Sequence, residues 1–133
     1  MADYICMDGT IPTGRLPEVL RRMAEIVAGY GLRVANVFHA GDGNLHPLIL
    51  YDVNDPEQAA KAEAAGADIL KLCVEVGGCL TGEHGVGIEK RDLMRHQFTE
   101  TELALQAAVR RVFDPAEILN PGKVFPLDLA KAA

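Results

Sequence analysis

Two apolar runs on either side of a short glycine-rich turn constrain the fold more than any other feature of the sequence. The runs, Arg33 to His39 and Leu45 to Tyr51, are rich in the aliphatic and aromatic residues typical of strands. Between them lies Ala40-Gly41-Asp42-Gly43-Asn44, whose residue types favour a tight reversal of the chain. The sequence therefore predicts a β-hairpin, which commits the chain to an antiparallel sheet.

An amphipathic helix is predicted on each side of this hairpin. The first has Pro17 in its opening turn, apolar residues at helical spacing, and a stop at Gly29 and Gly31. The second opens at Asp55-Pro56-Glu57-Gln58, which combines a cap, a proline at the first helical position and a glutamine placed to return a hydrogen bond. Gly77-Gly78 is expected to end it.

The order of the remaining elements gives the fold class. Short strands are predicted at Tyr4 to Met7 and at Cys79 to Thr81, and Thr99 with Glu102 forms a capping box before a later helix. This order fits a split β-α-β unit. We predict an α+β fold in which a ferredoxin-like antiparallel sheet carries helices on one face. A C-terminal helical tail follows, and residues 1–133 form a single domain.

Charge and cysteine content exclude several classes of function. The net charge is −6, from 13 basic and 19 acidic residues without a long run of one sign, which argues against nucleic-acid partners. The longest apolar stretch, near Val34 to Phe38, is too short to span a bilayer, so no membrane insertion is expected. Cys6, Cys73 and Cys79 lack CxxC spacing and favour a reducing compartment. We predict a cytoplasmic location, with any membrane association made through partner subunits.

Two histidines beside the hairpin turn suggest a metal site. His39 closes the first strand and His46 opens the second, and facing positions in a hairpin have Cβ atoms about 4.5–5.5 Å apart. Glu83 follows in a later glycine-rich loop. Two histidines and a carboxylate, with coordination positions left open, are the donor set of catalytic zinc or non-haem iron. We predict that His39, His46 and Glu83 bind a metal.

The loop that contains Glu83 also offers a candidate base. Its sequence, Gly82-Glu83-His84-Gly85-Val86-Gly87, has GxxGxG spacing and not the GxGxxG of a dinucleotide loop. Neighbours in an extended chain point to opposite faces, but a positive φ at Gly82 or Gly85 can turn both side chains into one cavity. His84 would then stand as a general base beside a metal ligand.

Other polar residues have plainer interpretations. Asp42 between two glycines is ordinary turn chemistry, and if it has a further role we favour orienting a histidine over direct ligation. His96 is interpreted as solvated. Lys90, Arg91 and Lys123 are interpreted as exposed, with a contact to a substrate carboxylate as the alternative. Cys79 is interpreted as a small apolar side chain, with a thiolate role near the proposed site as the alternative.

Three motifs in order resemble the C-terminal signature of the FAD-linked oxidases. They are His39-Ala-Gly-Asp-Gly-Asn-Leu-His46, Gly77-Gly-Cys-Leu-Thr-Gly-Glu-His-Gly85 and Asn120-Pro-Gly-Lys-Val-Phe125. The resemblance runs from about Asp3 to Phe125. Within the vanillyl-alcohol-oxidase superfamily it points to the group of the glycolate oxidase flavin subunit and D-lactate dehydrogenase.

The resemblance implies a function and its cofactors. The chain would be the substrate-side, cap-domain part of a dehydrogenase that oxidises a small 2-hydroxy acid, of the glycolate or D-lactate type, to the 2-oxo acid by hydride transfer to FAD. In relatives with a metal, a divalent ion for which we expect zinc, the ligands match His39, His46 and Glu83, and the catalytic base matches His84. The Asn120 motif matches the tail segment that returns toward the flavin, so Asn120 is a predicted cofactor-binding residue.

The resemblance also implies a missing partner. The N-terminal FAD-binding domain lies outside this sequence, so the isolated chain is expected to be inactive. Its natural partner would be that flavin domain or other oxidase subunits, and surface left exposed would favour a homo-oligomer. Two other functions stay open: a metal-dependent hydrolase, in which His84 or Glu83 activates a bound water, and a non-catalytic assembly module. Neither explains the Asn120 motif.

Overall fold

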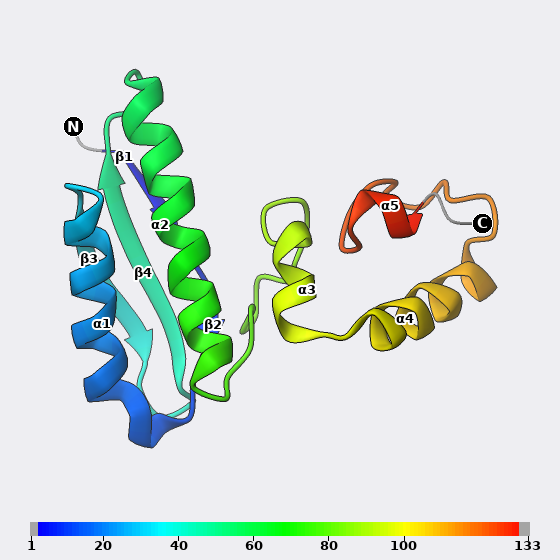
Figure 1. Ribbon diagram of the computed structural model, residues 1–133, viewed down its shortest axis with the longest axis horizontal. Coiled ribbons are helices and arrows are strands. Elements are labelled where there is room, and N and C mark those ends of the chain that lie inside the picture. Colours follow the sequence, from blue (N-terminus) through cyan, green and yellow to red (C-terminus); the bar gives the residue numbers. More distant parts are fainter. Residues whose placement is uncertain (1–2, 131–133) are drawn as a thin grey trace. The chain divides into compact units, whose positions relative to one another are not determined.

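The computed structural model describes residues 3–130 of the protein, which belong to two compact units (Figure 1). One unit ends at His84 and the other begins at Gly85. The single domain predicted for residues 1–133 stays a prediction, because compactness does not show how many units unfold cooperatively. The first unit contains β1 (Asp3–Cys6), β2 (Gly9–Thr10), the 3-10 helix η1 (Thr13–Arg15), α1 (Leu16–Gly29), β3 (Arg33–His39), β4 (Asn44–Tyr51) and α2 (Pro56–Glu75).

Strand β4 is the centre of an antiparallel four-stranded sheet. β3 pairs along one edge of β4, and β1 and β2 pair along the other. The pairings Cys6↔Leu48 and Gly9↔Leu45 belong to one continuous register. Met7 and Asp8 lie between β1 and β2, so this register places Asp8 opposite His46. The predicted hairpin is confirmed, with β3 at the expected bounds and β4 beginning one residue earlier.

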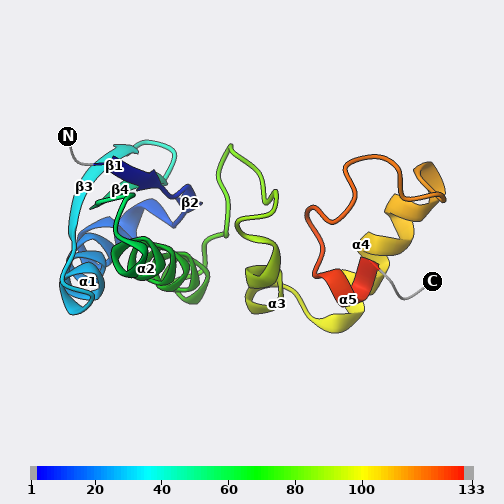
Figure 2. The ribbon, with the colours of Figure 1, turned by 90° about the horizontal axis from the view of Figure 1, so that it is seen from above.

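Helices α1 and α2 pack on the same face of the sheet (Figure 2). Their apolar residues meet alternate residues of β4, which is the pattern of a strand with one buried face. The buried apolar residues of this layer include Val19, Met23, Val27, Leu45, Ile49, Ala62, Ala65, Ile69, Leu70 and Cys73. The predicted α+β class, an antiparallel sheet with helices on one face, is confirmed.

The start of α2 follows its predicted chemistry with one difference. The Asp55 side chain accepts hydrogen bonds from the backbone amides of Glu57 and Gln58 and so caps the helix. Gln58, however, donates its side-chain amide to the Asp55 carboxylate, and its carbonyl oxygen accepts from the backbone of Asp52. The glutamine therefore fixes the capping carboxylate and does not bond the backbone of the cap residue.

The strand predicted at Cys79 to Thr81 is wrong. Cys79 forms one isolated bridge with Thr10, through two backbone hydrogen bonds of 3.1 Å, and the fourth strand of the sheet is the two-residue β2. The chain leaves the sheet after this bridge because the Thr81 hydroxyl and the backbone amides of residues 82–84 hydrogen-bond to the Asp8 carboxylate. The backbone amides of residues 82–84 therefore bond a side chain and are not available to pair with another strand.

The second unit is helical, as predicted for the tail. It contains the 3-10 helix η2 (Arg91–Leu93), α3 (Met94–Gln97), α4 (Glu100–Phe113) and α5 (Leu127–Ala130). The predicted capping box opens α4. After α4, the Asp114 carboxylate accepts the backbone amides of Ile118 and Leu119, and Arg110 donates to the carbonyls of Leu119 and Lys123. An arginine and an aspartate near the end of α4 thus hold the irregular segment that follows it.

Two basic residues of this unit are not the solvated side chains that the sequence suggested. Lys90 is buried, and Arg91 donates a 2.8 Å hydrogen bond to the carbonyl oxygen of Gly122. The sequence pattern around them is polar, but the partner of Arg91 lies 31 positions later, so the local pattern does not reveal this contact. Among residues 3–130, no helix is both long enough and apolar enough to cross a membrane.

Candidate metal and acid–base site

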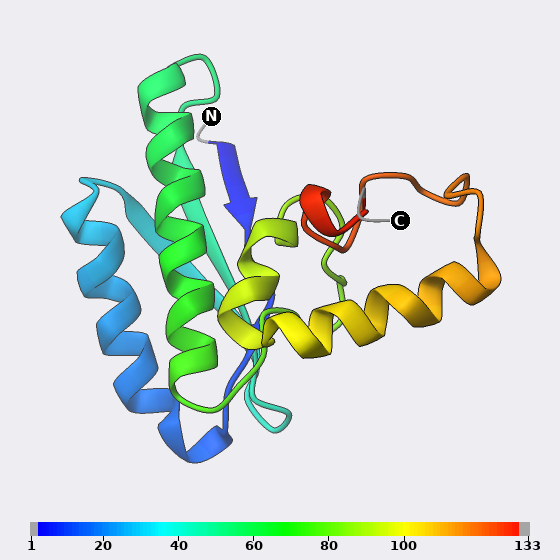
Figure 3. The ribbon, with the colours of Figure 1, turned by 45° about the vertical axis from the view of Figure 1, so that its right-hand side comes forward.

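The two predicted histidines lie on one face of the sheet, opposite the helices. We call this the histidine face, formed by Arg33, Ala35, Val37 and His39 of β3 and by Asn44, His46, Leu48 and Leu50 of β4. The turn that joins β3 to β4 lies at the same end of the unit as the end of α2 (Figure 3). His39 pairs with Asn44, and Val37 pairs with His46. The two histidines are therefore diagonal neighbours. The sequence-based expectation of directly facing positions is wrong.

Diagonal placement still brings the two imidazoles together. Diagonal positions on a sheet are about 7–8 Å apart at the backbone, which long or aromatic side chains can bridge. The ring centroids of His39 and His46 are 5.5 Å apart, with the planes at 84°. A single ion could therefore contact both rings.

Glu83 and His84 join this pair from the loop that follows Cys79, named here the Glu83 loop (residues 81–84). Glu83 Oε1 is 3.2 Å from His46 Nε2 and 4.0 Å from His39 Nε2. The His84 ring is stacked on His46, with centroids 5.1 Å apart and planes at 21°. Of the two glycines considered, Gly85 has the positive φ, 83°. All four residues predicted for the metal and the base thus converge, while their roles stay predictions.

Asp8 is the site residue that the sequence analysis missed. It is fully buried, accepts hydrogen bonds from the Glu83 loop, and has Oδ1 3.4 Å from His46 Nε2. Asp42, the aspartate favoured for orienting a histidine, is exposed in the turn, and its backbone amide donates to the His39 carbonyl. The sequence signal for Asp8 is that it directly follows the strand predicted at Tyr4 to Met7, but its contact with His46 follows only once that segment is paired with β4.

The donor atoms fit a divalent cation. His46 Nε2 is buried and makes no hydrogen bond of acceptable geometry among residues 3–130, although the Glu83 and Asp8 carboxylate oxygens lie 3.2 and 3.4 Å away. The buried Oδ1 of Asn44 also lacks a hydrogen bond within these residues. A buried polar atom without a hydrogen bond costs about 1–3 kcal/mol, and a bound cation would remove this cost at the imidazole nitrogen. Zinc bonds of 2.0–2.1 Å in a tetrahedron separate the ligand atoms by about 3.3 Å. The separations of 3.2 and 3.4 Å from His46 Nε2 to the Glu83 and Asp8 oxygens match that spacing.

The cluster is buried on one side and open on the other. The His46 side chain is 11% exposed, whereas the side chains of His39 and Glu83 are 60% and 58% exposed. Within 4.8 Å of one another lie two alternative ligand sets, His39 with His46 and Glu83, and Asp8 with His46 and His84. The first set leaves coordination positions toward solvent, as a site that binds a small chelating molecule requires.

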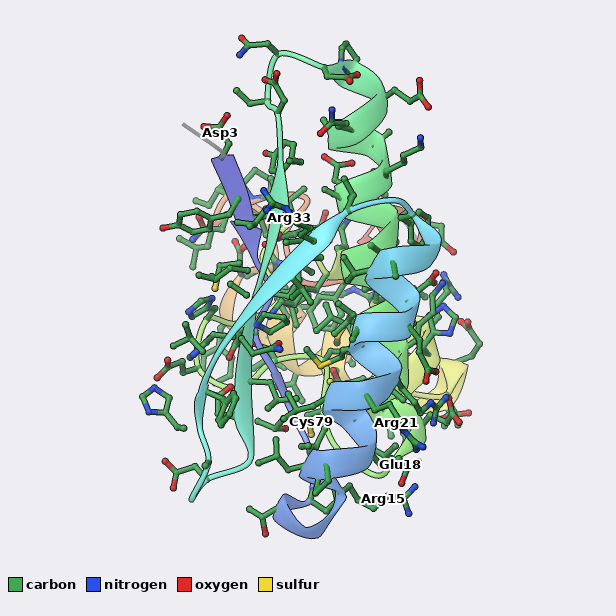
Figure 4. All side chains as sticks on the ribbon, turned by 90° about the vertical axis from the view of Figure 1, so that its left-hand side faces the viewer. Asp3, Arg15, Glu18, Arg21, Arg33 and Cys79 are labelled. Atoms are coloured by element: carbon green, nitrogen blue, oxygen red, sulfur yellow. The ribbon has the colours of Figure 1, made fainter. Side chains whose placement is uncertain are left out.

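Other features of the histidine face lie away from the cluster. Arg33 is at the opposite end of β3 from His39, about 20 Å along the strand. Figure 4 shows Arg33 and Asp3 at one end of the unit and Cys79 at the other. A cavity of 490 Å³ lined by Asp3, Arg33 and Tyr51 belongs to the Arg33 end. Neither Arg33 nor this cavity can contact an ion held by His46.

Asn120, predicted to bind the cofactor, lies in the second unit. It is exposed, has a positive φ of 49°, and its carbonyl oxygen accepts a 3.2 Å hydrogen bond from Arg110. The backbone at this point is therefore held in an uncommon conformation by α4, with the side chain available to another molecule. His96, on α3, is exposed as expected.

The chain is similar to known flavoenzyme sequences. Residues 2–124 match the family described as FAD linked oxidases, C-terminal domain. The chain is 57% identical to the glycolate oxidase subunit GlcD of Escherichia coli (strain K12) over 124 residues. This match covers 93% of this chain and 25% of that protein. It is 35% identical to the Bacillus subtilis (strain 168) protein of the same name, covering 96% of this chain and 27% of that one. It is 36% identical to a mitochondrial D-lactate dehydrogenase [cytochrome] of Kluyveromyces lactis, covering 91% of this chain and 20% of that one. The chain thus spans about a quarter of the length of these relatives.

Proposed function

Because the chain belongs to the family of FAD linked oxidase C-terminal domains, we propose that it forms the substrate side of a flavin-dependent 2-hydroxy-acid dehydrogenase. The relatives are named for glycolate and D-lactate, which are both small 2-hydroxy acids. The observation that carries the proposal is the convergence of His39, His46 and Glu83, with His84 stacked on His46, on one open face of the sheet. Substrates of this class chelate a metal through the hydroxyl and the adjacent carboxylate.

His39, His46 and Glu83 are the proposed ligands of a divalent cation, for which we propose zinc. A bound cation of this kind would orient the hydroxyl and carboxylate of the acid and lower the pKa of the hydroxyl. His84 is the proposed general base, because its ring is stacked on His46 and is exposed to the side from which a substrate would enter. General-base catalysis commonly contributes about 10²–10⁴-fold. His84 would hold the hydroxyl proton during the reaction, and a bound FAD would supply the acceptor for the hydride of the substrate Cα.

The flavin is proposed to reside mainly in a domain outside these 133 residues. An apolar stripe on the second unit is the proposed contact with that domain or with a partner subunit. Leu105, Val109 and Val112 recur along one side of α4, and all are more than half exposed, as are Ile118 and Leu119 in the following segment. Several exposed apolar side chains on one side of a helix favour a partner surface. Asn120 adjoins the stripe and is proposed to approach the flavin, in an enzyme that works in the cytoplasm.

A cobalt titration tests the metal site on the 133-residue chain. Co²⁺ absorbs visible light when held by nitrogen and oxygen ligands, so binding can be followed directly. We expect one equivalent to bind to the wild type and to His96→Ala, which removes an exposed histidine outside the cluster. His46→Ala should lose binding, since it removes the ligand that the other donors surround. Equal Co²⁺ affinity in both variants would contradict the site.

A second titration tests the substrate class. Added to the Co²⁺-loaded chain, glycolate or D-lactate should shift the visible spectrum, because the hydroxyl and carboxylate can occupy two open positions together. Acetate and propionate, which lack the hydroxyl, are the matched controls and should need much higher concentrations. If all four acids act alike, the cluster does not select 2-hydroxy acids. Ester hydrolysis by the zinc-loaded chain without flavin would instead support the metal-dependent hydrolase.

A further inference from the structure

We propose that Asp8 is a positioning residue that holds the Glu83 loop so that Glu83 and His84 face the histidines of the hairpin. The proposal rests on the proposed function for the roles of Glu83 and His84. It concerns a residue that belongs to neither the proposed ligand set nor the proposed base. Three independent features of the first unit support it.

The first feature is the register of the sheet. β1 and β2 pair with β4 in one register, so Asp8 lies opposite His46. Directly opposed residues of an antiparallel pair share a face. The Asp8 side chain therefore lies on the histidine face. Asp8 is in the short break between β1 and β2, the two strands that pair with this edge of β4.

The second feature is the set of donors around this carboxylate. Oδ2 of Asp8 accepts the Thr81 hydroxyl at 2.8 Å and the backbone amides of Gly82, Glu83 and His84 at 2.8, 3.1 and 3.0 Å. A buried carboxylate is tolerated only with such donors, and hydrogen bonds to a charged acceptor are among the strongest in proteins. Three consecutive amides on one oxygen fix the backbone at the residues whose side chains reach His46.

The third feature is the lack of free space between Asp8 and the loop. A Cβ added at Gly82 would lie 2.7 Å from Oδ1 of Asp8 and 2.5 Å from Oδ1 of Asn44. The loop backbone therefore rests directly on two buried polar side chains. Asp8 thus lies between β4 and the loop and contacts both. Its Oδ1 is 3.4 Å from His46 Nε2 of β4.

Amide hydrogen exchange on the metal-free 133-residue chain tests the anchor. In the wild type, the amides of Gly82, Glu83 and His84 should be protected although they belong to no helix or strand. Asp8→Asn keeps the shape but loses the charge, and it should reduce protection at these amides about tenfold or more, the effect of losing a hydrogen bond to a charged group. Amides of β3 and β4 should keep their protection, which shows that the variant is folded. Thr81→Val, which removes one donor, is the milder variant if Asp8→Asn does not fold, and it should give a smaller loss at the same amides.

Two further measurements report on the positions of the side chains at the site. The stacked rings of His46 and His84 should give a nuclear Overhauser contact in the wild type that Asp8→Asn loses. Co²⁺ affinity should fall about tenfold or more in Asp8→Asn, as for other residues that orient metal ligands, and stay unchanged in Asp42→Asn, the matched exposed aspartate. Unchanged loop protection, an intact ring contact, or unchanged Co²⁺ affinity in Asp8→Asn would overturn the proposal. A wild type that binds no Co²⁺ would instead refute the metal site, and the exchange and ring measurements would still decide the role of Asp8.

Discussion

Replacing Gly82 by alanine tests how tightly the Glu83 loop is packed. The added Cβ would lie 2.5 Å from Oδ1 of Asn44 and 2.7 Å from Oδ1 of Asp8, whereas ordinary contacts begin at 3.4 Å. Asp8 is fully buried and Asn44 is 7% exposed, so neither side chain can swing into solvent. The loop must therefore move by roughly 0.7–0.9 Å to reach normal van der Waals separation.

The expected cost of Gly82→Ala is about 1–3 kcal/mol in the free energy of unfolding, the usual range for an extra methyl group in a packed interior. Gly41→Ala is the matched control. Gly41 lies in the hairpin turn, has no positive φ, and an added Cβ there meets no atom within 4 Å. Its substitution should change the free energy of unfolding by less than about 0.5 kcal/mol.

Urea unfolding followed by circular dichroism measures both variants. With a slope of about 2 kcal/mol per molar urea, a 2 kcal/mol loss lowers the midpoint by about 1 M. The Co²⁺ affinity of Gly82→Ala should fall as well, because Glu83 moves with the loop. If Gly82→Ala unfolds at the wild-type midpoint and binds Co²⁺ normally, the loop is not packed against Asp8 as described, and the positioning role of Asp8 loses its third support.

Three other predictions concern pH, catalysis and assembly. The Tyr30 hydroxyl donates a 2.7 Å hydrogen bond to Asp68, which, with a lesser effect of Lys71, holds the pKa of Asp68 below its ordinary value. A lowered carboxyl pKa gives stability that is present above the unfolded-state pKa and is lost as pH falls through the folded-state pKa. Tyr30→Phe should thus lower the urea midpoint at pH 7 and lose its effect in acid, and a difference that persists in acid would disprove this linkage. His84→Ala should keep Co²⁺ binding in the chain, yet in a complete enzyme built from this sequence it should lower turnover by about 10²–10⁴-fold, and near-normal turnover would exclude His84 as the base. The chain should self-associate in analytical ultracentrifugation through the α4 stripe, and Val112→Lys, at a site 77% exposed, should shift it toward monomer; a wild type that is monomeric at every concentration would argue against this.

The parts of the fold that the sequence predicted depend on neighbours close along the chain. The hairpin needs only the turn residues and the two runs beside them, and the observed bounds of β3 and β4 agree with the prediction to within one residue. The caps at Asp55 and Thr99 involve partners two or three residues away. Turn and capping preferences act over these short distances, so a single sequence contains enough information to place them.

The parts that were missed depend on contacts between distant segments. β2 is two residues long, so it has no alternation to detect, and it exists because Gly9 and Thr10 pair with residues about 35 positions later. Cys79 resembles a strand residue but finds only one bridge, with Thr10. Burial of Lys90 likewise depends on packing that composition does not reveal.

The candidate site combines both kinds of contact, and this has a physical consequence. His39 and His46 are set by a local hairpin, whereas Glu83 and His84 reach them only because Asp8, more than seventy residues earlier, accepts the amides of their loop. The two histidines should therefore be arranged even when the loop is disturbed, and the carboxylate ligand and the base should be lost together. A variant that disturbs Asp8 then differs from one that removes a histidine. It should leave the hairpin pair able to bind a cation weakly, but without the glutamate that completes the site and without the base that substrate oxidation requires.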